Sequence, residues 1–161
     1  MTATPTTSTD ILTTTARAER LYYRYARAVD EGDLDELRAL ATPDVKVSRG
    51  SGDPAEGIEA FLDVYRAHNA LKVPVCKHVI TNITAQPEAA DGTVTTHAYF
   101  EAKLLTDAET KVIIGYYDDV HVVVGDEHLL AHKKIVAERV LMLPGSAGSY
   151  TYVGSTPEGI I

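Results

Sequence analysis

Two residues in this chain are of types that enzymes use to move protons. Asp30 stands at the end of a predicted helix that begins near Asp10, just before Gly32. A carboxylate in that place faces the negative end of the helix dipole, which disfavours its ionised form by roughly 0.3–1 kcal/mol. A residue that is unfavourable at its local position, as an acidic residue is at the end of a helix, is expected at functional or strained sites. The plain alternative is that residues 30–33 form a polar turn between two helices.

His78 lies in the first of four predicted long strands, on the same face as Ile80 and Asn82. Because its unperturbed pKa is about 6.5, an imidazole can remove a proton beside a carbonyl and assist the leaving oxygen in an elimination of water. A lone inward histidine is otherwise a core residue bonded to a backbone carbonyl. The strand pattern alone does not separate these two roles.

The elements that must position these residues fall into two blocks. Helical periodicity and two capping boxes, at residues 33–36 and 53–56, predict three helices, the second ended by Pro43 and the third begun at Pro54. They are expected at about 10–29, 33–42 and 54–69, with a short strand at 45–48 and a loop at 49–52. Alternating patterns then predict strands at 73–85, 93–105, 111–124 and 128–141. This order predicts an α+β architecture in which helices cover one face of a strongly curved antiparallel sheet.

The composition limits the classes of function. The chain has 161 residues, which suggests one domain, and a net charge of −8 with no basic patch, so we expect no nucleic-acid or anionic-membrane partner. We expect residues 1–9 to be disordered, residues 10–142 to form the domain and residues 143–161 to form a tail that covers a cavity or contacts another subunit. A mobile tail is the alternative.

Other absences narrow the chemistry further. A single cysteine, Cys76, fits a reducing cytoplasm, and no apolar run approaches the roughly 20 residues of a membrane span. The N-terminus has no basic start or apolar middle, so it does not read as a secretory signal. No metal-ligand spacing, glycine-rich phosphate loop or nucleophile elbow is present. We therefore expect neither a metal nor a cofactor, which leaves cofactor-free chemistry or plain binding.

Three segments in this order resemble the SnoaL-like members of the nuclear transport factor 2-like superfamily. They are residues 22–37 (YYRYARAVDEGDLDEL), residues 77–82 (KHVITN), and residues 115–121 (GYYDDVH) followed by residues 131–136 (AHKKIV). Together they span most of residues 10–142. One departure is the absence of tryptophan; the family often has one at the start of the last strand, near His128. The superfamily includes enzymes, binding modules and scaffolds, so the resemblance specifies a fold more than a reaction.

The resemblance implies a cone-shaped sheet around the long helix, with a pocket inside. Asp30 and His78 match the Asp–His pair of the branch that contains scytalone dehydratase, hexachlorocyclohexane dehydrochlorinase and bile-acid 7α-dehydratase. Tyr25 matches a tyrosine of the bile-acid enzyme. In this interpretation His78 is the base, Asp30 orients it and stabilises the imidazolium, and Tyr25 donates a hydrogen bond to a substrate oxygen.

Five further residues are candidates for substrate binding. Tyr22 could form a wall for a flat ligand, Asp119 matches a family aspartate whose structural role is favoured over a catalytic one, and His121 is a candidate cavity group. His132 and Lys134 share one face of the last strand, and Lys134 falls about where relatives place an arginine. If that face looks into the cone, both line the pocket; if it looks outward, both are solvated.

The sequence thus favours a cofactor-free dehydratase, cyclase or isomerase for a hydrophobic, polyketide- or steroid-like carbonyl compound. Self-association is also expected from the resemblance, most often as a dimer. The main alternative is a non-catalytic ligand-binding or oligomerisation module. Epoxide hydrolysis ranks lower because the second strand offers Glu101 but no arginine, and a ketosteroid-isomerase mechanism would have Asp119 as its only obvious acid. A short Asp30–His78 distance beside an apolar pocket favours an enzyme.

Overall fold

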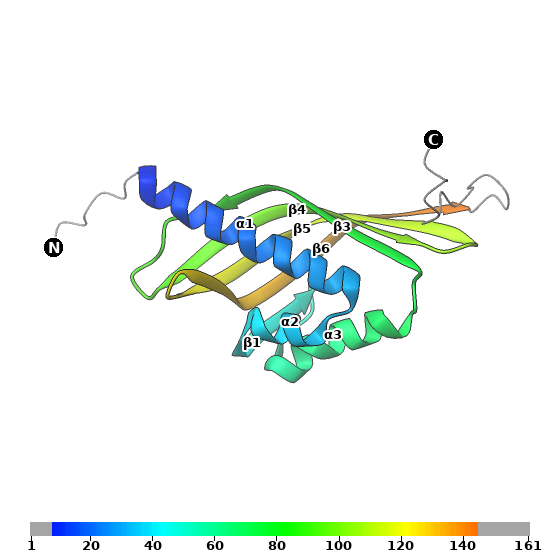
Figure 1. Cartoon of the computed structure of the whole chain (residues 1–161), viewed down its shortest axis with the longest axis horizontal. Coiled ribbons are helices and arrows are strands. Elements are labelled where there is room, and N and C mark those ends of the chain that lie inside the picture. Colours follow the sequence, from blue (N-terminus) through cyan, green and yellow to red (C-terminus); the bar gives the residue numbers. More distant parts are fainter. Residues whose placement is uncertain (1–7, 145–161) are drawn as a thin grey trace, which may run out of the picture.

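A computed structural model describes residues 8–144 of the chain, in which the long helix α1 (Ser8–Glu31) lies across one face of a curved sheet (Figure 1). The short helix α2 (Leu34–Ala39) and helix α3 (Ile58–Ala70) follow and lie near the end of α1. The strands are β1 (Ala41–Arg49), β2 (Ala55–Glu56), β3 (Val75–Ala85), β4 (Thr93–Leu105), β5 (Glu109–Val124) and β6 (Glu127–Pro144).

One six-stranded sheet has the order β2-β1-β6-β5-β4-β3. The four long strands β3 to β6 form the expected antiparallel meander, whereas β1 pairs with β6 in parallel, so that the sheet is mixed. The predicted α+β class, with helices before a curved sheet, is confirmed.

The core lies between α1 and the sheet because the helix is amphipathic. Its apolar stripe, predicted from helical spacing, is buried along its length and comprises Leu21, Tyr22, Tyr25, Ala26 and Val29. The second helix has the predicted cap, in which Asp33 Oδ1 accepts a hydrogen bond from the backbone N–H of Glu36 at 2.9 Å.

Two predicted helix boundaries are wrong. The third helix begins at Ile58 rather than Pro54, because Ala55 and Glu56 pair with β1 as strand β2 and Gly57, at φ 93°, turns the chain into the helix. The second helix ends at Ala39, well before Pro43, which lies in an irregular stretch of β1.

A β-bulge at Ala131 changes the expected alternation of the last strand. His121 pairs with Leu130 and Val120 with His132, which leaves Ala131 as the extra residue. Because a one-residue slip moves each following side chain to the other face, Lys133 points inward and is fully buried.

The predicted terminal segments fall mostly outside the described residues. Strand β6 continues through Leu143 to Pro144, beyond the predicted end of the domain at 142. Helix α1 begins at Ser8, so residues 8 and 9 are not part of a disordered N-terminus as expected for residues 1–9. The rest of that segment and residues 145–161, where a lid was expected, lie outside the described residues. Within residues 8–144, no helix is long and apolar enough to cross a membrane.

Candidate active site

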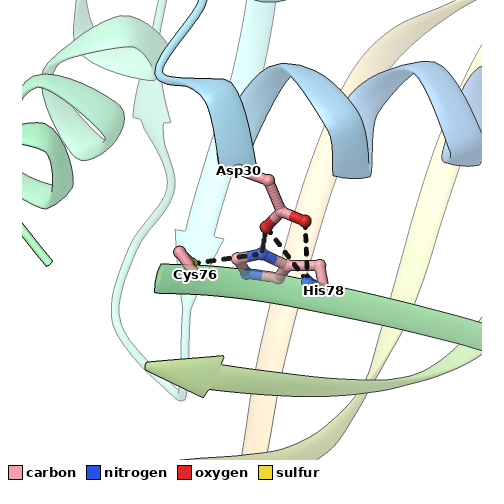
Figure 2. A group of neighbouring side chains, drawn as sticks. All are labelled: Asp30, Cys76 and His78. Carbon is pink, nitrogen blue, oxygen red and sulfur yellow. Dashed lines mark hydrogen bonds and ion pairs between the residues drawn. The ribbon is translucent and has the colours of Figure 1, made fainter. Parts of the chain in front are cut away.

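Helix α1 and strand β3 bring Asp30 and His78 together (Figure 2). The carboxylate Oδ1 lies 2.7 Å from Nδ1 of the imidazole, and the two carboxylate oxygens also accept the backbone N–H of His78 at 3.0 and 3.1 Å. The two side chains are only 9% and 10% exposed. A carboxylate held in this way keeps the ring proton on Nδ1, so that Nε2 remains free to accept a proton.

The end of α1 is fixed where it presents Asp30. Gly32 adopts φ 70°, a conformation that favours glycine and ends the helix, and its carbonyl accepts a hydrogen bond from Asn69 Nδ2 of α3 at 3.1 Å. A side chain at position 32 would also meet Asn69, at 3.1 Å. Helix α3 therefore holds the turn that carries the carboxylate.

His78 borders a pocket of about 530 Å³ between α1, α3 and the inner face of the sheet. Most of its lining is apolar or aromatic and includes Val29, Val64, Leu71, Phe100, Ala102, Leu104, Ile113, Tyr117 and Ile135. Tyr25 also lines it, whereas Asp30 does not and so lies behind the imidazole. Because residues five apart on a helix diverge by roughly 140°, Tyr25 and Asp30 point in different directions from α1.

Tyr25 is suited to donate a hydrogen bond into this pocket. Its ring is 2% exposed, and Tyr65 donates its hydroxyl proton to the Tyr25 oxygen at 3.1 Å. Burial raises the pKa of Tyr25, with the charge of Asp119 a further cause, so the phenol stays protonated at neutral pH. The phenol of Tyr25 therefore keeps a proton that it can donate, and its hydroxyl also interacts with that of Tyr117.

Arg49 is a pocket residue for which the sequence predicted only a place in a loop. It ends β1 and lines the pocket, and within the described part of the chain it makes no ion pair with a carboxylate. The charge of Arg49 also affects His68 on α3. Burial lowers the pKa of His68, and the charges of His78 and Arg49 lower it further. A signal for this role was available in the position of the residue, since an arginine followed by Gly50 at a strand end can reach a cavity mouth.

The predicted contact residues Tyr22 and Asp119 instead form a buried polar network beneath the pocket. Asp119 accepts hydrogen bonds from Lys133 Nζ at 2.7 Å, from the Tyr22 hydroxyl at 3.0 Å and from the backbone N–H of Lys134 at 2.8 Å. The Lys133 ammonium also lies 3.1 Å from the ring centroid of Tyr117. Burial lowers the pKa of Lys133 to about 8, although Asp119 opposes this shift.

The other three candidates also lie outside the pocket lining. His121 is fully buried and lies 3.3 Å from Thr96 Oγ1. His132 Nε2 lies 3.1 Å from Ser48 Oγ, and Lys134 is 42% exposed and 3.9 Å from Asp118. The bulge explains the placement of Lys134, because it exchanges the faces of Lys133 and Lys134.

Cys76 and His68 lie beside the Asp30–His78 pair, and the sequence did not indicate a role in the site for either residue. Cys76 Sγ lies 3.8 Å from His78 Nδ1 and 3.5 Å from His68 Nε2. Burial raises the pKa of Cys76 to about 12, and the nearby charge of Asp30 contributes, so the thiol is neutral. Asp30, Cys76 and His78 offer three donor atoms that lie within 4.8 Å of one another, a grouping that can hold a metal ion.

Solved structures share this fold at low sequence identity. A proposed scytalone dehydratase from Novosphingobium aromaticivorans is 17% identical, with a TM-score of 0.74 over 89% of this chain and 99% of that one. A hexachlorocyclohexane dehydrochlorinase from Novosphingobium barchaimii is 15% identical, with a TM-score of 0.71 over 85% and 94%. The β subunit of a proposed aromatic-ring-hydroxylating dioxygenase from N. aromaticivorans is 16% identical, with a TM-score of 0.64 over 78% and 89%. At these identities the likeness establishes the fold alone.

A comparison with curated proteins finds no match. The family model for the SnoaL-like domain matches residues 10–134, which include nearly all of α1, the Asp30–His78 pair and the first part of β6. This match covers most of the chain, and the protein therefore belongs to the SnoaL-like family.

Proposed function

We propose that the protein is a cofactor-free acid–base enzyme, a dehydratase, cyclase or isomerase, that acts on a hydrophobic carbonyl compound. The observation that carries the proposal is the Asp30–His78 contact of 2.7 Å at the edge of an apolar pocket of about 530 Å³. This volume falls within the range of roughly 300–1,000 Å³ that is usual for small-molecule sites. The family and the similar dehydratase and dehydrochlorinase folds support the same class of reaction.

In a dehydration, Nε2 of His78 takes the proton from the carbon beside the carbonyl. The electron pair left on that carbon forms the new double bond, and the bond from the neighbouring carbon to the hydroxyl oxygen breaks. The imidazolium returns the proton to the departing oxygen, which leaves as water, and the histidine is neutral again. Asp30 favours the intermediate imidazolium because its carboxylate already bonds Nδ1.

Tyr25 and Arg49 are placed to stabilise negative charge that develops on the carbonyl oxygen. Tyr25 provides a phenol proton from inside the pocket, and Arg49 provides a charged donor at the pocket lining. Tyr25 is buried, and a donor that is fixed before the reaction stabilises such an oxyanion strongly where water is excluded. Arg49 is exposed, so it acts from the solvent side of the pocket. The aromatic and aliphatic walls favour a ring-containing, polyketide- or steroid-like body for the substrate.

Turnover of β-hydroxy ketones by the wild-type protein and by His78→Ala tests the assignment. The absorbance of the conjugated enone product reports the rate. We expect His78→Ala to lower kcat by about 10²–10⁴-fold, the usual contribution of a general base. His97→Ala is the matched control, because His97 also lies beside an aspartate, at 2.6 Å, but on the outer face of the sheet.

Equal turnover by wild type and His78→Ala would contradict the proposal, provided that circular dichroism shows both proteins to be folded. Loss of turnover in His97→Ala alone would move the site to the outer face. Binding of the ketones without turnover by the wild-type protein would favour the non-catalytic alternative, a small-ligand binding module.

We also propose that the protein forms a homo-oligomer, most simply a dimer, through the sheet. Exposed apolar side chains gather on the extended ends of the meander, namely Leu105, Ile114, Val140, Leu141, Met142 and Leu143. Patches of this kind commonly mark contacts between subunits. The mass in solution, measured by light scattering after size-exclusion chromatography, tests this; a monomer at all concentrations would contradict it.

A further inference from the structure

Four metal-binding side chains from three elements converge beside the pocket. Asp30 comes from the end of α1, His68 from α3, and Cys76 and His78 from alternate positions of β3, so that these two share one face of the strand. Figure 2 shows Cys76 next to the imidazole that faces Asp30. No linear spacing predicts this cluster, because its members are brought together only by the packing of the two helices on β3.

We propose that Asp30, His68, Cys76 and His78 bind a thiophilic divalent cation, with Zn²⁺ the ion that best fits the donors. One thiolate, two imidazoles and one carboxylate are the ligand types of zinc sites, whereas magnesium and calcium prefer oxygen alone. Imidazole and thiolate together also suit copper and cobalt, so the preference for zinc rests on the usual four-coordinate geometry of that ion.

The two distances from Cys76 are close to those of a tetrahedral site. However, His68 is not among the three residues whose donor atoms all lie within 4.8 Å of one another, so its ring must move toward Asp30 and His78 when the ion binds. Bonds of about 2.3 Å to sulfur and 2.0–2.1 Å to nitrogen place neighbouring ligand atoms roughly 3.5 Å apart. Cys76 Sγ lies 3.5 Å from His68 Nε2 and 3.8 Å from His78 Nδ1. The 2.7 Å contact between Asp30 and His78 is a hydrogen bond, and it must lengthen by roughly 0.6 Å when a cation takes the place of the proton.

The charges of the site balance in the bound state. The thiol releases its proton on binding, so one thiolate and one carboxylate neutralise the dication. The Lys77 ammonium, which would repel the cation, lies 4.0 Å from Asp30 Oδ2, and its side chain is 67% exposed and free to turn into solvent. His68 and His78 both line the pocket, which provides a route of entry for the ion.

Metal binding would turn off the base that the proposed function requires. In the metal-free pair the proton sits on Nδ1 of His78 and Nε2 accepts the substrate proton. When Nδ1 binds the cation, the neutral imidazole carries its proton on Nε2 and cannot accept another. This inhibitory consequence rests on the proposed function, whereas the binding site does not.

Cobalt(II) titration of the full chain tests the site without any substrate. Cobalt is a spectroscopic substitute for zinc, and a bound thiolate gives a charge-transfer band in the near ultraviolet. We expect this band in the wild-type protein, its loss on addition of excess zinc, and its absence in Cys76→Ser. His68→Gln is expected to keep the band and to bind about 10–100-fold more weakly. His97→Ala, the control on the outer face, is expected to bind like wild type.

Absence of the band in the wild-type protein would overturn the site, as would unchanged affinity in His68→Gln. Should Cys76→Ser fail to fold, the His68→Gln titration still decides the question. Turnover with and without zinc then separates the two proposals. If zinc inhibits turnover and does so more weakly in His68→Gln, both the metal site and the proposed enzyme are supported. If the cobalt band appears but the protein turns over none of the β-hydroxy ketones, the metal site alone is supported. The inhibitory consequence is contradicted if turnover is unchanged at a zinc concentration that fully removes the cobalt band.

Discussion

The inner and outer faces of the sheet each carry a histidine beside an aspartate, and the two pairs differ mainly in burial. Inside, His78 and Asp30 are 2.7 Å apart and 10% and 9% exposed. Outside, His97 and Asp118 are 2.6 Å apart and 40% and 39% exposed. Both histidines border a hollow, of about 530 and 440 Å³. A short distance and a nearby cavity therefore do not by themselves distinguish a catalytic pair.

What separates the two pairs is how firmly water is excluded and the carboxylate is held. Asp30 also binds the backbone N–H of His78 through both oxygens, so the carboxylate and the strand are joined at three points. Asp118 shares its charge with Lys134, 3.9 Å away at the surface. Because exposed ion pairs are worth roughly 0–1 kcal/mol, the outer pair is free to break and reform.

The largest contrast is expected when each aspartate loses its charge. Asp30→Asn removes the acceptor that fixes the Nδ1–H tautomer and stabilises the imidazolium, so we expect kcat to fall by about 10²–10⁴-fold. Asp118→Asn is expected to change kcat less than about twofold, since its partner histidine is solvated. Steady-state kinetics on one β-hydroxy ketone measures both. Similar losses in the two variants would show that burial is not what distinguishes the pairs.

Stability should show a second contrast, between Asp119 and its neighbour in sequence, Asp118. Asp119→Asn leaves the fully buried Lys133 without a counter-charge, and breaking a buried pair of this kind costs about 3–5 kcal/mol. Asp118→Asn should cost less than about 0.5 kcal/mol. Urea unfolding measures both free energies of unfolding. A loss below about 1 kcal/mol for Asp119→Asn would show that Lys133 reaches water or neutralises at little cost.

The residues of the pair could be predicted from the sequence, whereas the face of each neighbouring residue could not. The helical stripe of α1 and the strand pattern around His78 are local signals, and they predicted the helix and the meander, whereas the pairing of Asp30 with His78 was implied by the family resemblance. The bulge at Ala131 is a property of strand pairing, so alternation favoured neither face for Lys134 and missed Lys133 as the buried cation. The same holds for Gly57, whose turn and the pairing of β2 moved the start of α3.

Non-local packing also explains the pocket residues that were missed. Arg49 and His68 come from β1 and α3, and each reaches the pocket only because these elements fold against the meander. His68 carries no local motif, and the local signal for Arg49 is limited to its place before Gly50 at a strand end. Tyr22, in contrast, was singled out from the sequence but does not line the pocket. Its spacing on α1 correctly predicted an inward side chain, but the ring is buried against Thr96 and Asp119.

Arg49 allows a smaller test of the inner face, because it is the cation at the pocket lining. Arg49→Gln should lower kcat/KM by about tenfold for a ketone substrate, since one charged donor to the developing oxyanion is replaced by a neutral one. Lys134→Gln, the corresponding change on the outer face, should have less than a twofold effect. If Lys134→Gln is the more damaging variant, the pocket has been assigned to the wrong cation.

The smallest expected effect is on the pH dependence of stability. Burial lowers the pKa of His121 well below its usual value, with the charges of His128 and Lys133 as further causes, so the folded protein keeps this ring neutral. Below about pH 6.5 the unfolded chain binds a proton at this position that the native state does not, and stability therefore falls as the pH decreases. His121 contributes at most about 1.4 kcal/mol per pH unit to that slope. Urea unfolding between about pH 7 and pH 5 should give a flatter profile for His121→Gln than for wild type, whereas His97→Gln should not flatten it in this way. Parallel profiles for wild type and His121→Gln would mean that the buried ring is protonated in the native state, and that the polar network on the inner face is more accessible to protons than its burial indicates.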